Sequence, residues 1–180
     1  MLLPDSKITN VMSVDVEDYF QVGAFEHTIP REDWTRWPCR VEGNIERILA
    51  MFARHDIKAT FLTLGWIAER YPHTVRRIVD AGHELASHGY AHQRASALTV
   101  AEFRQDVSRA KALLEDIAGQ AVSGYRAPSF SIGGGNLWAL DVLAAAGKEG
   151  AKADFAGHRR TPLDMTTRSP AAPASGKCGN

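Results

Sequence analysis

Two histidines four residues apart and a group of acids are the side chains best suited to chemistry in this chain. The histidines are His88 and His92, in the segment HGYAH, and the acids lie in the segment SVDVEDYF, residues 13–20. Imidazoles at this spacing can meet one metal ion on a helix or in a tight loop. Two histidines and one carboxylate with open positions form a common catalytic metal site, for Zn²⁺ among others. The alternative is a pair of solvent-facing or capping histidines.

The acids Asp15, Glu17 and Asp18 stand at the end of an apolar run that begins at Ile8. Asp15 and Glu17 are two residues apart, so on a strand they face the same way. One of them can bind a metal while the other stays free as a base, and a buried acid cluster requires a cation. The alternative is a solvated turn that caps the next segment. Asp18 is a ligand only if the chain turns early, and we expect it at the surface.

Arg126 lies in the segment YRAPSF, where Pro128 rigidifies the chain that follows. The residue before a proline is biased to an extended conformation. A guanidinium fixed in this way can hold a carboxylate through two hydrogen bonds. An ordinary surface salt bridge is the competing interpretation.

Strands and helices alternate along the chain, and the predicted strands end where the reactive residues lie. Alternation of this kind predicts an α/β fold of parallel strands with crossover helices, whose sites form at the carboxyl ends of the strands. The limits of the elements are predicted from four signals: the spacing of apolar residues, Pro72, Gly119, and a capping box formed by Thr99 with Glu102. Strands are predicted at 8–15, 58–65, 82–89 and from 124, and helices at 41–54, 66–81 (interrupted at Pro72), after Thr99 to Gly119, and 136–146.

The composition is typical of one globular domain and gives no reason to expect a highly charged partner. The 180 residues carry 21 basic and 21 acidic side chains, which gives no electrostatic reason to expect nucleic acid as a partner. No apolar run spans a bilayer, and MLLPDSKITN is too short and polar for a signal peptide, so we expect a cytoplasmic location. Residues 148–180 contain few large apolar side chains, and we expect them to be disordered.

Taken together and in this order, the segments resemble the polysaccharide deacetylase family, also called the NodB-homology or carbohydrate esterase 4 family. SVDVEDYF is similar to the first family motif, ATFLTLG to its second strand, GHELASHGYAH to its metal–histidine motif and YRAPSF to its arginine motif. The resemblance covers roughly residues 8–147. The segment DVEDYFQV is most similar to the sequences of a subgroup linked to bacterial exopolysaccharide production.

The resemblance implies a distorted (β/α) barrel and metal-dependent removal of N- or O-acetyl groups from an acetylated poly- or oligosaccharide. It implies that Asp15 is the general base, that Arg126 orients it, and that the backbone near Ser129 helps to form an oxyanion site. By the same resemblance, a divalent metal, most often Zn²⁺, is bound by Glu17, His88 and His92.

The resemblance stops after Gly147. The family continues with further strands that carry an acidic motif and a late Leu-x-x-His motif, whose histidine serves as general acid. Residues 148–180 resemble neither motif. We therefore expect residues 1–147 to be the N-terminal part of a deacetylase domain with an open, truncated barrel, and residues 148–180 to be a non-family tail. The competing interpretations are a non-catalytic fragment that binds metal or sugar, and a cyclic amide hydrolase on a related fold.

Overall fold

The computed structural model describes residues 11–148, in which strands and helices alternate as the sequence predicts. The predicted disorder of the C-terminal tail concerns residues that, from 149 onward, lie outside this range. The strands are β1 (Ser13–Val16), β2 (Thr60–Thr63), β3 (Glu84–Ser87) and β4 (Gly124–Tyr125). The α-helices are α1 (Val41–Arg54), α2 (Gly65–Arg70), α3 (Pro72–Asp80), α4 (Val100–Ala118) and α5 (Trp138–Lys148). Five short 3₁₀ helices are η1 (Tyr19–Gln21), η2 (Gly23–Phe25), η3 (Arg31–Arg36), η4 (Ala95–Ala97) and η5 (Pro128–Phe130).

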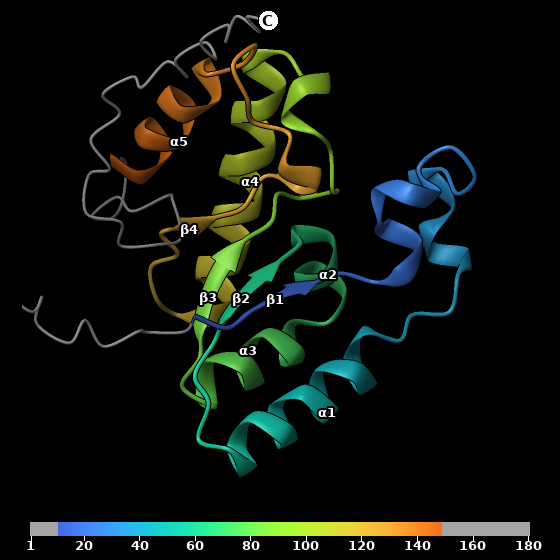
Figure 1. Ribbon diagram of the computed structural model, residues 1–180, viewed down its shortest axis with the longest axis vertical. Coiled ribbons are helices and arrows are strands. Elements are labelled where there is room, and N and C mark those ends of the chain that lie inside the picture. Colours follow the sequence, from blue (N-terminus) through green and yellow to red (C-terminus); the bar gives the residue numbers. More distant parts are fainter. Residues whose placement is uncertain (1–10, 149–180) are drawn as a thin grey trace, which may run out of the picture.

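The four strands form one sheet in the order β1-β2-β3-β4, and every neighbouring pair is parallel. Because the order never reverses, each crossover turns in the same sense and the connecting helices gather on one side of the sheet. This is the winding of a (β/α) barrel, whereas a doubly wound sheet reverses at a switch point. Around the sheet, α1 contacts α3 and α4 contacts α5 (Figure 1). The predicted α/β fold with crossover helices is confirmed.

Local sequence signals account for the principal helices. In α1 the buried residues Val41, Ile45, Leu49 and Phe52 recur at helical spacing, which gives the helix one apolar face. The longest helix, α4, begins with the predicted capping box and ends at Gly119, whose φ of 65° favours glycine. Pro72 stands at the first position of α3, so it separates α2 from α3 as predicted.

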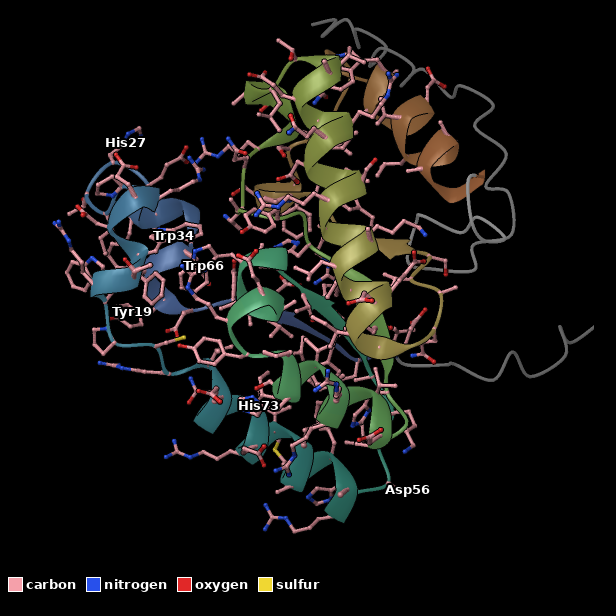
Figure 2. The ribbon with its side chains drawn as sticks, turned by 180° about the vertical axis from the view of Figure 1, so that it is seen from behind. Tyr19, His27, Trp34, Asp56, Trp66 and His73 are labelled. Carbon is pink, nitrogen blue, oxygen red and sulfur yellow. The ribbon has the colours of Figure 1, made fainter. Side chains whose placement is uncertain are left out.

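The aromatic-rich segment between β1 and α1 folds against the start of α2. The rings of Phe20, Trp34 and Trp66 are buried and pack edge to face or tilted, with 5.5 Å between the centroids of the two tryptophans. Figure 2 shows Trp34 and Trp66 lying together on this side of the molecule. Edge-to-face aromatic pairs add to the free energy gained by burying their surface. The segment therefore forms a fixed wall beside the carboxyl end of β1.

The sheet has open edges within residues 11–148. β1 and β4 each have one neighbouring strand there, so the barrel is not closed, in agreement with the predicted partial barrel. Among these residues, no helix combines the length and the apolar character that crossing a bilayer requires.

Candidate metal centre and active site

Glu17, His88 and His92 meet at the carboxyl ends of β1 and β3. Glu17 directly follows β1, His88 directly follows β3, and the ligand atoms offered by the three side chains all lie within 4.8 Å of one another. The two imidazoles are 1% and 7% exposed, and their ring centroids are 5.1 Å apart. Parallel strands bring their carboxyl ends to one edge, so residues more than seventy positions apart in sequence share one site.

The carboxylate of Glu17 has an atom without a hydrogen-bond partner. Its Oε2 is buried and accepts no hydrogen bond, although His92 Nε2 lies 3.0 Å away. A buried carboxylate oxygen without a partner is costly, whereas a cation between the carboxylate and the two imidazoles would compensate its charge. The donor set of two imidazoles and one carboxylate is one that Zn²⁺ and similar divalent ions accept. On this test the residues fit a divalent metal.

His88 is held in the tautomer that a metal ligand requires. Its Nδ1 lies 2.8 Å from the backbone carbonyl oxygen of Arg126, which can only accept a hydrogen bond. The proton is therefore on Nδ1, and Nε2 keeps its lone pair for a ligand. Burial lowers the pKa of His88 below its ordinary value, so the ring is neutral near pH 7.

Asp15 and Arg126 form an ion pair beside the histidines. Arg126 Nη1 donates to Asp15 Oδ1 at 2.5 Å, and Nη2 donates to Ser13 Oγ at 2.9 Å. Both side chains of the pair are partly exposed, so the carboxylate is oriented and still open to solvent. The predicted contact between a fixed guanidinium and one of the acids is thus present, and the acid is Asp15. Such an arrangement can hold a carboxylate in position to accept a proton.

These groups line a single cavity of about 230 Å³. Asp15 and Glu17 both border it, as their spacing on one face of a strand predicts, while Val16 between them is buried in the core. The opposite wall is η5, where Ser129 and Phe130 have φ values of 53° and 51°. Positive φ is uncommon outside glycine and marks a backbone held in place by its surroundings. The full lining is Asp15, Glu17, Val22, Gly23, His88, His92, Arg126, Ala127, Ser129 and Phe130.

The expectation that Asp18 lies at the surface is wrong. Its side chain is 3% exposed, and its carboxylate accepts the N–H groups of Tyr19 at 2.9 Å, Arg40 at 2.5 Å and Val41 at 2.9 Å. It therefore joins η1 to the start of α1, where the free N–H groups and the helix dipole favour an anion. With both oxygens engaged, Asp18 faces the backbone, and the acid placed with the histidines is Glu17.

Sequence reasoning did not single out Val22 and Gly23, which also line the cavity, where Gly23 lies close to Ser129. The available signal was their position, because they directly follow the acid cluster in a stretch that is irregular and rich in aromatics. The side chains that fix the histidine loop, Arg31 and Asp106, carried no recognisable signal. They are described below.

Fold and site together define a class: an α/β protein wound like a (β/α) barrel, with a carboxylate and two histidines at the carboxyl ends of its strands. The family model for polysaccharide deacetylases matches residues 33–150, and the chain belongs to this family. The matched range contains His88, His92 and Arg126, whereas Asp15 and Glu17 precede it.

Individual relatives agree with the family. A peptidoglycan deacetylase of Helicobacter pylori is 34% identical over 87 residues, which are 48% of this chain and 30% of the relative. A chitooligosaccharide deacetylase of Bradyrhizobium is 32% identical over 104 residues, which are 57% of this chain and 45% of the relative. A crystal structure of a Mycobacterium smegmatis protein, assigned to the polysaccharide deacetylases, superposes with a TM-score of 0.63 at 28% identity. That superposition covers 76% of this chain and 48% of the other. The chain thus spans about half of these relatives' length or less.

Proposed function

We propose that this chain carries the metal-binding and base-bearing part of a hydrolase that removes acetyl groups from the sugars of a polysaccharide. The observation that carries the proposal is the single cavity shared by the Glu17–His88–His92 cluster and the Asp15–Arg126 pair. The names of the relatives, which act on peptidoglycan and chitooligosaccharides, support acetylated amino sugars as the substrate class. The proposal of an exopolysaccharide as the natural substrate is supported by the resemblance of the segment DVEDYFQV.

In this proposal Glu17, His88 and His92 hold a divalent metal, most often Zn²⁺. The bound metal would polarise the acetyl carbonyl and acidify a water molecule. Asp15 would accept the proton of the attacking water, and Arg126 would keep its carboxylate turned toward the cavity. The backbone N–H at Ser129, on the opposite wall, would donate to the oxygen on which negative charge develops.

We also propose that the deacetylase-like part ends near residue 147. The family match, which extends to residue 150, supports this proposal. A fragment that binds metal or sugar without turnover is the second candidate, favoured because β4 has a neighbouring strand on only one side among residues 11–148. The two candidates differ in turnover and agree in metal binding.

The test uses the purified 180-residue chain, Zn²⁺ and acetylated chito-oligosaccharides, with acetate release and metal content measured together. A deacetylase releases acetate, and Asp15→Asn abolishes the release without losing the metal, because Asp15 lies outside the ligand cluster. The double variant His88→Ala/His92→Ala loses both metal and activity. Asp33→Asn, which changes a partly exposed acid in an ion pair with the exposed Arg36, is the matched control and should behave like the wild type.

The outcomes separate the candidates. Zinc binding without acetate release favours the non-catalytic fragment. Acetate release that survives in the double histidine variant contradicts the metal site, and release that survives in Asp15→Asn contradicts the assignment of the base.

A further inference from the structure

The loop that leads from His88 to the second candidate metal-binding histidine, Gly89–His92, has most of its backbone groups hydrogen-bonded. The N–H of Gly89 donates to Ser87 Oγ at 3.2 Å. The carbonyls of Gly89 and Tyr90 accept the first two N–H groups of α2, from Gly65 and Trp66, each at 2.9 Å. A loop in which backbone groups find fixed partners loses the freedom that loops ordinarily have.

Three further backbone groups of the loop are bound by two side chains from distant elements. Asp106, in the second turn of α4, accepts the N–H of Tyr90 at 3.1 and 3.2 Å with its two carboxylate oxygens. Arg31, the first residue of η3, donates from Nε to the carbonyl of Ala91 at 2.9 Å and from Nη2 to the carbonyl of His92 at 3.4 Å. The carboxylate of Asp106 thus accepts from an N–H donor of the loop, and the guanidinium of Arg31 donates to two of its carbonyl oxygens.

The environment of Asp106 is built around this loop. Burial raises the pKa of its carboxyl group, while the N–H groups of Tyr90 and Ala91 and the charges of Arg109 and Arg31 act in the opposite direction. A Cβ added at Gly89, whose φ is 76°, would lie 2.8 Å from Asp106 Oδ2. The carboxylate thus fits against the backbone of the loop so closely that only a glycine leaves room for it.

The loop needs such support because its last residue is strained. His92 has a φ of 52°, in the left-handed region that residues with a Cβ rarely adopt. A non-glycine residue in that region carries a free-energy cost and persists only where the surroundings determine it. The carbonyl of this same residue is one of the two that Arg31 binds. In this backbone conformation Nε2 of His92 lies 3.0 Å from Oε2 of Glu17.

We propose that Arg31 and Asp106 are positioning residues for the metal centre, which act by clamping the Gly89–His92 backbone so that His88 and His92 converge on Glu17. Neither side chain lies in the ligand cluster or lines its cavity. The inference rests on the proposed metal site and extends it to two residues on η3 and α4 that set its affinity.

The test measures Co²⁺ affinity of the full 180-residue chain by visible absorption, in competition with a chelator of known affinity. Asp106→Ala and Arg31→Ala should each weaken Co²⁺ binding about 10- to 100-fold, the range typical of residues that orient metal ligands. They should also change the shape of the Co²⁺ spectrum, since the histidines reach the ion in a different geometry. Asp106→Asn and Arg31→Lys keep part of the hydrogen bonding and should recover part of the affinity.

Matched controls lie on the same two elements. Arg36, at the end of η3, is exposed and pairs with Asp33, and Asp116 of α4 is exposed. Arg36→Ala and Asp116→Ala should bind Co²⁺ like the wild type. Thermal unfolding of each metal-free variant separates a positioning effect from a general loss of structure. If Asp106→Ala does not fold, the Co²⁺ affinities of Asp106→Asn and Arg31→Ala test the positioning role instead.

The results distinguish the inference from the function on which it rests. Co²⁺ binding by Asp106→Ala and Arg31→Ala within about twofold of a wild type that binds the ion overturns the positioning role and leaves the metal site standing. Failure of the wild type to bind Co²⁺ overturns the metal site itself and the positioning role with it.

Discussion

Replacement of Asp18 by alanine should destabilise the fold strongly, although Asp18 is neither a core hydrophobe nor a proposed ligand. The carboxylate accepts three backbone N–H groups, two of them at the start of α1, and is almost fully buried. Alanine leaves these donors without a partner and removes a negative charge from the helix N-terminus. Because the Asp18 side chain is 3% exposed, bulk water has little access to these donors.

The magnitude follows from the individual donors. An unsatisfied buried N–H costs about 1–3 kcal/mol. The N–H groups of Tyr19 and Arg40 are only partly buried and contribute less than that of Val41, so Asp18→Ala should lower the free energy of unfolding by about 2–5 kcal/mol. Domains of this size are stable by about 5–15 kcal/mol in total, so the loss is a large fraction. Asp18→Asn keeps one oxygen for the N–H groups of Arg40 and Val41 and should lose about half as much.

Urea unfolding followed by tryptophan fluorescence measures this loss, because the buried Trp34 and Trp66 lie in the segment that Asp18 anchors. Asp33→Ala is the control, since its ion pair with the exposed Arg36 is open to solvent on one side and should be worth less than about 1 kcal/mol. A value for Asp18→Ala as small as that of Asp33→Ala would refute the assignment of Asp18 as a buried anchor between η1 and α1.

Three further predictions concern the core and the histidine loop. Burial lowers the pKa of His83 below 6.5, so as the pH falls the unfolded chain takes up this proton before the folded chain does. The free energy of unfolding should therefore fall as the pH drops below about 6.5, and urea unfolding of His83→Asn should show a flatter pH dependence. Gly65→Ala places a Cβ 2.6 Å from the Tyr90 ring and 3.2 Å from its Cα, so it should cost about 1–3 kcal/mol in urea unfolding and weaken Co²⁺ binding; an unchanged affinity would contradict the tight contact. Phe103→Ala empties a fully buried site and should cost about 3–5 kcal/mol, whereas Phe130→Ala, at a side chain 85% exposed, should leave thermal stability unchanged.

The order and type of the elements follow from local patterns in the sequence. Helical spacing of apolar residues defines α1, the Thr99–Glu102 pair and Gly119 bound α4, and Pro72 separates α2 from α3. These signals work because hydrogen bonds and caps within a helix join residues three or four apart. The parallel topology then requires the residues after β1 and β3 to meet at one edge, which is why an acid of the first segment could be expected beside His88 and His92. The choice of Glu17 among the acids came only from the family resemblance.

Contacts between distant segments carried no such signal. An aspartate after a strand has the same local sequence whether it faces solvent or caps a helix, so the burial of Asp18 was decided by the path of the chain from Glu17 to Val41. Arg31 and Asp106 look like ordinary charges on 3₁₀ and α-helical segments, and their hydrogen bonds span 60 and 16 residues.

The sequence by itself thus determined the α/β alternation and the chemical types gathered at the carboxyl ends of the strands. Only the tertiary structure decided which acid faces the histidines, which one is committed to backbone N–H groups, and which charges hold the histidine loop. The physical reason is the range of the forces involved. Periodicity and capping act within a few residues, whereas the burial of a carboxylate depends on everything that packs around it.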